Sequence, residues 1–508
     1  MSRLTLQSAA LAALASAGLA ACAISPDPLT LPQINVIAQN NASRVTANQE
    51  PVTRGISLYE AMARALKYNL DHRVEMMQQS LRTTELDLAH YNLLPNAVAN
   101  SGYAARDSYY STGELNLVTG QQTPPRTTSQ EKRHSISDIT FSWNILDFGL
   151  SLIRARQSAD KVLIAEEAKR KVIQRVIEDV RTAYWRAVSS DRMIQKLKGL
   201  EARTKSALDS ARALHSGREA SPITALTYER ELVEITRTAQ RLQRELSVSK
   251  AQLAALMNLP PDSGFALSSG ALDIKTPPSR SDGHDLIEHA LLHRPELRDI
   301  AYQQRINAAE ARAALLELLP GIQLTGAGNY DSNKYIDSNH WVSWGAKSTW
   351  NAVRLFQYPA KRDVIEAQDA LLDARALALT MAVMTQVHIS SIRYQHAMRE
   401  FRTARDYLDV QSRLVRQMRN EAAAERISEQ TLIREELNTL VAEVQRDIAY
   451  ASTQNAFANI YASIGMDPYA DEIDLKLGVS ELSSRLRGMW LERGDFKARW
   501  TKNVAFQQ

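Results

Sequence analysis

The chain is poor in the residues that form disulfides, sharp turns and nucleic-acid-binding surfaces. It has one Cys in 508 residues, which excludes internal disulfides and Cys-based metal sites. With 61 basic and 57 acidic side chains, it lacks the basic excess of nucleic-acid-binding proteins. Only 19 Gly and 16 Pro occur, and this scarcity favours long helices. No Gly-rich phosphate loop and no nucleophile motif is present, so we do not expect an enzyme.

Long apolar runs are also missing beyond the first 21 residues. We therefore expect no transmembrane helix in the mature protein, so that a membrane crossing requires strands. The first 21 residues have the pattern of an export signal, with Arg3 before a charge-free stretch rich in Ala and Leu. Residues 19–22, Leu-Ala-Ala-Cys, resemble the lipobox of bacterial lipoproteins, which predicts a covalent lipid on Cys22. The alternative is a buried N-terminal transmembrane anchor or a Cys that occurs there by chance.

The chain contains two similar halves. Residues 65–95 begin with Ala-Leu, end with Leu-Leu-Pro and match residues 290–320, 225 positions further on. After a loop that is longer in the first half, the offset becomes 207, so that Trp143 matches Trp350. A constant offset over roughly a hundred residues indicates an internal repeat. We predict a signal peptide at 1–21, an extended tether at 22–55, repeats at 56–265 and 283–468, a linker at 266–282 and a C-terminal segment at 469–508.

Two alternating segments in each half predict strands. Ile139, Phe141 and Trp143 alternate with polar residues, as do Val342 and Trp344 in the second half. Each segment is about ten residues long, which suits a strand that crosses a membrane at a tilt. Four strands cannot close a barrel alone, whereas three chains supply twelve.

Long helices flank these strands. The stretch from Leu150 to Leu214 has no Pro and a single Gly, and its apolar residues repeat at helical spacing. A helix of about 65 residues is roughly 95 Å long, more than a compact globule requires. After Pro222 a second helix returns with apolar residues at coiled-coil spacing. The other predicted helices cover residues 58–94, 286–319, 360–418 and 428–464.

The order of these elements resembles that of the TolC-like outer-membrane efflux proteins. The likeness is carried by the two Leu-Leu-Pro stops, by residues 57–61 (Ser-Leu-Tyr-Glu-Ala) and by residues 143–149 (Trp-Asn-Ile-Leu-Asp-Phe-Gly). It covers residues 56–468, and the lipobox is similar to that of the lipid-anchored multidrug and metal efflux members. The resemblance implies a mainly α protomer with a membrane β-barrel portion. Its trimer would form a twelve-stranded outer-membrane barrel continuous with a long periplasmic α-helical barrel.

The same resemblance implies a channel subunit, lipid-anchored in the bacterial outer membrane and extending into the periplasm. It would be a passive conduit that exports drugs, toxic compounds or metal ions, without a cofactor other than the lipid on Cys22. Its partners would be a periplasmic adaptor protein and an inner-membrane pump, and residues 266–282 and 469–508 would form a belt around the helices. Two alternatives remain open, an outlet for type I secretion of proteins or polymers and a non-conducting periplasmic coiled-coil scaffold.

Candidate functional residues lie in the hairpin turns and the strands. The adaptor-docking candidates at the two helix tips are Gly217, Arg218, Ser221, Arg426 and Ser428, with ordinary solvated turn residues as the alternative. In some family members aspartates ring the pore after the tip. They are absent here, and the candidates for the pore or gate are Glu429, Thr431, Arg434 and Glu435.

Aromatic and imidazole side chains give two further hypotheses. Trp341 and Trp344 are candidates for an aromatic girdle at the bilayer surface, with packing against the helices as the alternative. His289 and His293 lie four residues apart on a predicted helix, a spacing that places two imidazoles on one face. No third ligand accompanies them, so we predict no metal site.

Overall fold

The computed structural model describes residues 27–47, 49–111, 113, 115–122, 128–216, 222–260, 263–268, 283–424, 426–465 and 474–492. The chain divides into two units, Met1–Pro51 and Val52–Gln508. The predicted signal at residues 1–21 and the lipid attachment at Cys22 lie outside the described residues. Both therefore stay predictions.

The described part of the first unit contains a helix, α2 (Leu31–Val45), where the sequence predicts an extended tether. The backbone N–H of Thr30 donates to Oε1 of Gln33 over 2.8 Å, and Pro32 lies in the first turn. Both features stabilise a helix N-terminus. The expectation of an extended segment was wrong over these residues because local capping, which needs no long periodicity, is enough to start a helix.

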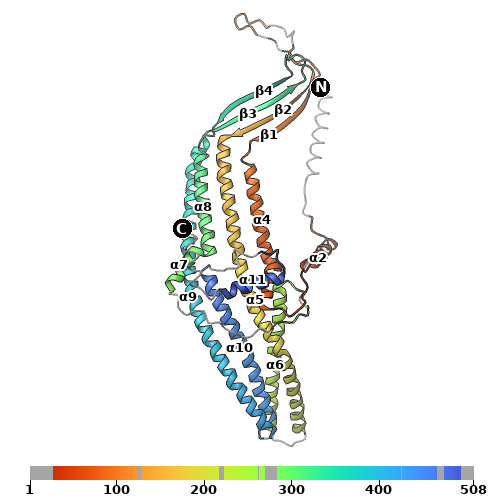
Figure 1. The fold of residues 1–508 in the computed structure, drawn as a ribbon. Helices are drawn as coiled ribbons and strands as arrows, with labels where there is room; N and C mark the ends of the chain where they lie inside the picture. The colour runs from red at the N-terminus through yellow and green to blue at the C-terminus, as the bar shows by residue number, and fades with distance from the viewer. Residues whose placement is uncertain are drawn as a thin grey trace. The chain divides into compact units, whose positions relative to one another are not determined.

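The second unit has the same order of elements in its two halves, as the sequence predicts (Figure 1). That the halves arose by duplication remains a prediction. The first half consists of α3 (Leu58–Tyr68), α4 (Leu70–Tyr91), β1 (Asn96–Ala105), β2 (Arg133–Asn144), α5 (Ile145–Ser216) and α6 (Pro222–Leu256). The second half consists of α7 (Gly283–His293), α8 (Pro295–Leu316), β3 (Gly321–Asp331), β4 (His340–Thr349), α9 (Val353–Ala423) and α10 (Glu429–Ser463), and α11 (Val479–Glu492) follows.

Each predicted opening helix is in fact two helices. Between α3 and α4, Asn69 is extended, with φ −62° and ψ 129°, and its side chain accepts a hydrogen bond from the N–H of His72. Between α7 and α8, Arg294 is extended because it precedes Pro295, which disfavours the helical conformation of the residue before it. The sequence contains both signals, but the apolar periodicity that runs through them predicted one continuous helix.

The helices of this unit form a wall that continues into the sheet. Next to the strands the helices contact one another in the order α4, α5, α8, α9, and further along the order is α6, α5, α10, α9. The strands follow the matching order β1, β2, β3, β4, all antiparallel. Because β2 runs directly into α5 and each other strand adjoins one helix of the wall, sheet and helices form one layer (Figure 1).

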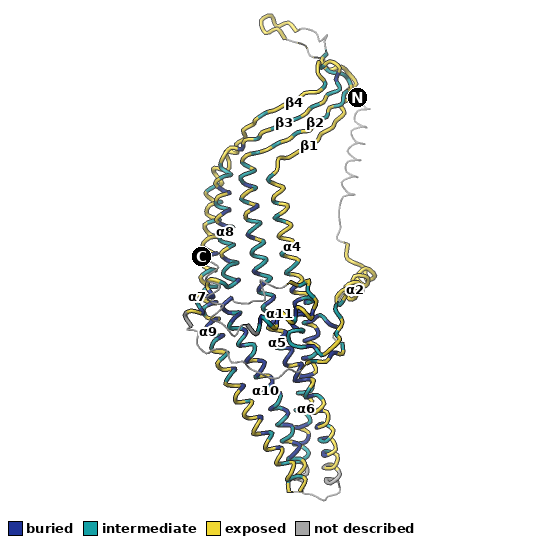
Figure 2. Tube along the Cα trace, viewed as in Figure 1, coloured by how far each residue is buried: buried dark blue, intermediate teal, exposed yellow. Residues whose placement is uncertain are grey.

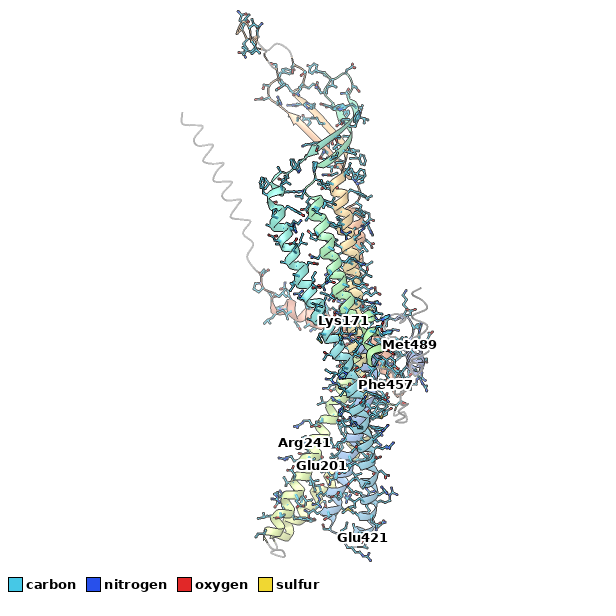
Figure 3. The ribbon with its side chains drawn as sticks, turned by 90° about the vertical axis from the view of Figure 1, so that its left-hand side faces the viewer. Lys171, Glu201, Arg241, Glu421, Phe457 and Met489 are labelled. Atoms are coloured by element: carbon cyan, nitrogen blue, oxygen red, sulfur yellow. The ribbon has the colours of Figure 1, made fainter. Side chains whose placement is uncertain are left out.

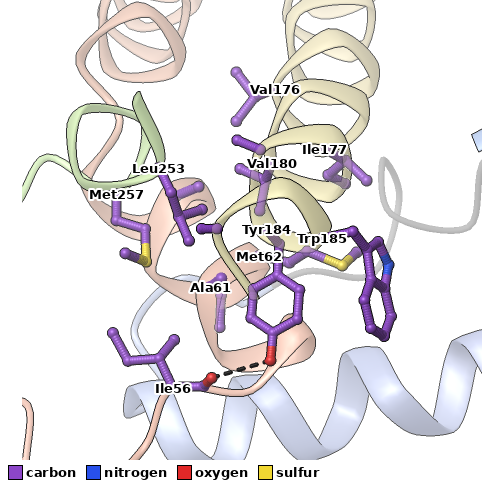
Figure 4. Close-up of a cluster of buried hydrophobic side chains, with 14 of the residues drawn as sticks. Ile56, Ala61, Met62, Val176, Ile177, Val180, Tyr184, Trp185, Leu253 and Met257 are labelled. Atoms are coloured by element: carbon purple, nitrogen blue, oxygen red, sulfur yellow. Dashed lines mark hydrogen bonds between the residues drawn. The ribbon is translucent and has the colours of Figure 1, made fainter. Parts of the chain in front are cut away.

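The largest buried cluster lies midway along α5, where α3, α6 and α11 pack against it (Figure 4). Tyr184 is buried there, and its hydroxyl lies 2.6 Å from the carbonyl oxygen of Ser268 and 3.1 Å from that of Ile56. Phe457 and Met489 lie at the level of α11, whereas Glu421 lies near the turn between α9 and α10 (Figure 3). The cluster therefore fixes the middle of the wall, away from both ends.

The helices at the two edges of the wall next to the strands, α4 and α9, are largely exposed (Figure 2), and both carry exposed apolar side chains. On α4 these side chains are Val74, Met77, Leu81 and Leu88, and on α9 they are Val364, Leu371, Leu377 and Met381. By length and composition α9 also contains an 18-residue stretch apolar enough to cross a membrane, with mean hydropathy 1.3 and 17% of it buried. Length and composition alone do not show that α9 crosses a membrane, so the absence of a transmembrane helix stays a prediction. Because this stretch lies in an edge helix, its exposed side chains belong to the apolar edge.

Candidate functional site

The strand register gives the sheet one apolar face. Phe141 of β2 lies opposite Ala97 and Gly326, and Gly326 in turn lies opposite Trp344. Since directly opposed residues share a face and alternate residues along a strand return to it, the register defines the whole face. The large side chains of this apolar face are Tyr103, Ile139, Phe141, Trp143, Ile322, Leu324, Tyr330, Val342 and Trp344. All nine are exposed.

Aromatic side chains lie toward both ends of the apolar face. Trp143 lies at the helix end, and Tyr103, opposite Ser135, lies toward the outer end. Trp143 and Ser135 are eight residues apart on β2, about 27 Å along the strand. At a tilt of about 40° this corresponds to a height of roughly 21 Å, close to the apolar band of roughly 25 Å in outer-membrane barrels. The face therefore has the chemistry and height of a lipid-facing surface.

The opposite face of the sheet is mainly polar, with Val98, Ile136 and Trp341 as its large apolar side chains. Its side chains include Asn96, Asn100, Asp138, Thr140, Ser142, Asn144, Gln323, Thr325, Asn329, Ser343 and Lys347. Hydrogen bonds join neighbouring strands on this face, such as Asn100 Nδ2 to Asp138 Oδ2 at 3.0 Å and Asn329 Nδ2 to Ser343 Oγ at 2.9 Å. A sheet with one apolar and one polar face suits a barrel with lipid outside and water inside.

The register separates the two tryptophans that the sequence assigned to one girdle. Trp344 lies on the apolar face and is 89% exposed, which fits the girdle. Trp341 lies opposite Asn329 and therefore on the polar face. Residues three apart in a strand point to opposite faces, so the joint assignment was wrong for Trp341. Trp350 packs at the strand–helix turn, where its Nε1 donates to the carbonyl oxygen of Leu318 over 3.0 Å.

Substitution by arginine tests these faces. Ile139→Arg places a charge in the middle of the apolar face and is expected to cost about 2–4 kcal/mol of stability in lipid. Ala327→Arg is the matched control, because Ala327 lies at a similar depth on the polar face, opposite Thr140. We expect only Ile139→Arg to lower the yield of folded, heat-modifiable protein in outer membranes. Equal loss from both variants would contradict the assignment.

The tip residues are only partly described. Gly217, Arg218 and Ser221 lie outside the described residues, so their role stays a prediction. Ser428 is the N-cap of α10, and its hydroxyl accepts from the N–H of Thr431 over 3.3 Å. Arg426 lies in the same turn, with its guanidinium 3.4 Å from Glu421. In the described turn, Ser428 thus has a structural role, and Arg426 is largely exposed to solvent.

The predicted gate residues mostly contact neighbouring helices. Glu429 lies 3.6 Å from Arg203 of α5, and Arg434 lies 3.8 Å from Glu231 of α6. Glu435 accepts a hydrogen bond of 2.8 Å from Gln411 of α9. Burial raises the pKa of Glu435, but hydrogen bonds from Gln411 and Asn438 and the charge of Arg434 outweigh it and hold the pKa below its usual value. Within the protomer these side chains therefore join neighbouring helices, and their role in a pore or gate stays a prediction.

A series of ion pairs between α5 and α10 was missed by the sequence reasoning. Arg192 pairs with Asp447, Lys196 with Glu443 over 2.8 Å, and Arg203 with Glu436. The sequence contains a pattern that predicts these pairs. The basic residues are spaced by four and then seven positions, and the acidic residues show the same spacing when α10 is followed from Asp447 back to Glu436. Antiparallel helices bring such mirrored series into register. The pairs hold α10 against α5 toward the tip.

The two histidines do not form a metal site with the described residues. His289 and His293 stack with ring centroids 4.1 Å apart, and His289 Nδ1 lies 3.3 Å from the carbonyl oxygen of Ile464. Burial, and then the neighbouring His293, lowers the pKa of His289. Among the described residues no group of three His, Cys, Asp or Glu side chains is placed to hold a metal ion.

The fold is shared with solved outer-membrane channels. The Campylobacter jejuni CmeC outer membrane channel matches with a TM-score of 0.65 and 14% identity, over 87% of this chain and 94% of that chain. The outer-membrane channel OprN matches with a TM-score of 0.61 and 16% identity, over 88% of this chain and 99% of that chain. The open state of the Neisseria gonorrhoeae MtrE channel matches with a TM-score of 0.61 and 13% identity, over 82% of this chain and 94% of that chain. No protein-family model and no curated protein sequence matches. The predicted resemblance is confirmed for the fold, which is that of the TolC-like outer-membrane channels.

Proposed function

We propose that this chain is a subunit of an outer-membrane channel that exports small molecules as a passive conduit. The observation that carries the proposal is the register of the sheet, which puts most large apolar side chains on one face and most polar side chains on the other. A periplasmic coiled-coil scaffold has no use for an exposed apolar sheet face about as tall as a bilayer core. The fold shared with CmeC, OprN and MtrE supports the same proposal.

Closure of the barrel requires further copies of the chain. The wall ends at β1, α4 and α6 on one side and at β4 and α9 on the other. Unpaired strand edges are not tolerated in lipid, so each β1 must pair with a β4 of another copy. The apolar residues exposed on α4 and α9 would be covered by the same contact. We propose that three copies close in a ring, which gives twelve strands above twelve helical rods.

The conduit would work with partners at its helix tips. We propose that an adaptor protein contacts the turns near residues 217–221 and 424–428, and that an inner-membrane pump drives the substrate into the duct. Since the ion pairs between α5 and α10 hold the tip together, opening requires a partner that binds the open state more tightly than the closed state. Efflux of drugs, toxic compounds or metal ions is the proposed role.

The first test is the native mass of the protein extracted from outer membranes in mild detergent. Three chains of 56.7 kDa each give about 170 kDa before signal removal and the addition of lipid and detergent. We expect this trimeric mass together with ion conductance in planar bilayers. A monomer, a dimer or recovery in the soluble periplasm would overturn the channel proposal.

The lipid anchor is tested separately. We propose that Cys22 carries the lipid, and Cys22→Ser is then expected to abolish incorporation of labelled palmitate. Incorporation that persists in the variant would contradict the proposed attachment. Since the barrel is itself a membrane element, we expect the variant to remain in the outer membrane.

A further inference from the structure

One row of side chains crosses the whole polar face of the sheet. Asn100 of β1 lies opposite Asp138 of β2, Asp138 lies opposite Asn329 of β3, and Asn329 lies opposite Trp341 of β4. We call these four residues the Asp138 row. In the closed barrel of the proposed function, each copy would contribute one such row, and the rows would form a belt around the inner wall.

Asp138 is the acidic side chain of this row and is held firmly. Its Oδ2 accepts hydrogen bonds from Asn100 Nδ2 at 3.0 Å and from Thr140 Oγ1 at 2.8 Å. Both donors are neutral, so the carboxylate keeps its negative charge without a cationic partner in these contacts. Because the hydrogen bonds come from β1 and from β2 itself, the charge is fixed at the surface of the polar face.

Apart from the tyrosines, the other ionisable side chains of the four strands lie nearer the strand ends, and they are Arg133, His134, Asp331, His340 and Lys347. Asp331 lies opposite Ile136, on the polar face one row further out, and adds charge of the same sign. Lys347 lies opposite Gln323, six residues along β3 from Asn329, or about 20 Å away. This exceeds the Debye length of about 10 Å at 0.1 M salt, so Lys347 does not neutralise the field at the Asp138 row.

Trp341 supplies an aromatic surface in the same row. It lies on the polar face and is 42% exposed, two strands or about 10 Å from Asp138. An exposed indole face attracts organic cations through its quadrupole, whereas a hydrated anion gains nothing from it. In the closed barrel, carboxylates and indoles would alternate around the belt, a combination that suits cations carrying apolar groups.

We propose that the Asp138 row is the charge filter of the barrel and makes the conduit favour cationic solutes, organic cations above all. The proposal rests on the proposed function, because it needs three copies of the chain around one lumen. Three carboxylates at one level act on every ion that passes, since the fields of identical rows add at the axis. Asp138 sets the preference for positive charge, and Trp341 extends it to alkylated ammonium ions.

The test is the reversal potential of the reconstituted protein under a potassium chloride gradient near 0.1 M. We expect a potassium-to-chloride permeability ratio above one for the unmodified protein, and a fall of about twofold toward unity in Asp138→Asn. Asn keeps an oxygen that accepts both hydrogen bonds, so the variant removes charge rather than the contacts. Asp138→Glu is expected to retain the preference. In Asp337→Asn, the matched control in the exposed β3–β4 loop, we expect the ratio to stay unchanged.

Trp341 is tested with tetramethylammonium in place of potassium. Trp341→Leu is expected to lower the tetramethylammonium-to-potassium permeability ratio and to leave the potassium-to-chloride ratio as it was. An unchanged tetramethylammonium ratio would overturn the role of Trp341. Conductance of normal size in Asp138→Asn with the ratio of the unmodified protein would overturn the charge filter and leave the channel standing. Absence of conductance from the unmodified protein would overturn both.

Discussion

Asp447→Ala is expected to raise the conductance of the reconstituted channel and to lower its midpoint of thermal unfolding. The Asp447 side chain is only 3% exposed and lies between Arg192 of α5 and Arg446, whose Nε donates over 3.0 Å. Removing it leaves two guanidinium groups beside each other without their shared carboxylate. The loss is expected to be about 3 kcal/mol per chain, the lower end for a broken buried pair, because both arginines keep some contact with solvent.

The effect on conductance follows from the position of Asp447 in the series between α5 and α10. Without this pair α10 is held by fewer contacts, so open forms of the tip gain population. Asp409→Ala is the matched control, because Asp409 forms an exposed pair with Arg413 over 3.0 Å on α9. Surface pairs of this kind contribute about 0.3–0.5 kcal/mol. Equal conductance and equal thermal midpoints in the two variants would contradict the role of the series.

Gly465→Ala is expected to prevent stable folding of the second half. Gly465 follows the end of α10 with φ +73°, a conformation that costs other residues about 1–2 kcal/mol. A Cβ atom there would also lie 2.5 Å from the carbonyl oxygen of His293 and 3.0 Å from the N of Arg294. Since both are backbone atoms at the turn between α7 and α8, the contact is relieved only by moving helices apart. We expect a total loss of about 3–5 kcal/mol.

Gly199→Ala is the control for Gly465→Ala. Gly199 lies inside α5, and within 4 Å of its added Cβ the structure places no atom from outside the local helix backbone. Alanine is therefore expected to stabilise the helix by about 1 kcal/mol. Thermal unfolding in detergent and the yield of trimer measure both variants. Normal yield and an unchanged midpoint for Gly465→Ala would show that the α10 end does not pack against this turn as described.

Much of the architecture could be predicted because long elements repeat their period many times. The helix from Leu150 to Leu214 was predicted within a few residues of α5, and the strand pattern around Phe141 placed β2. Helix breaks that are signalled by only a few residues were not predicted, because the apolar pattern around them favoured a continuous helix. Asn69 breaks a helix because its side chain accepts a capping hydrogen bond from the N–H of His72, three residues further on. The apolar pattern on either side of Asn69 continues without interruption.

The functional residues were harder to predict because they depend on which elements pair. The spacing of Arg192, Lys196 and Arg203 has meaning only once α10 is known to lie antiparallel to α5. The same holds for Asp138. In the sequence it is one polar residue of an alternating strand, and only the register shows that Asn329 and Trp341 lie in the same row. In contrast, the face of Trp341 could have been predicted from the sequence. Val342 and Trp344 alternate along the strand and share one face, so Trp341 must lie on the other face.

The open edges of the wall have a consequence for the life of the newly made chain. A single copy offers bare β1 and β4 backbones and two apolar helix edges, so it cannot complete its hydrogen bonding inside lipid alone. In the proposed trimer, insertion and assembly are therefore coupled, and the rate of assembly depends steeply on the concentration of copies. Until the proposed ring closes, we expect each copy to be prone to aggregation, because unpaired strand edges pair with any available strand. We therefore expect the lone protomer to be a client for chaperones and to gain its lasting stability only when the ring closes.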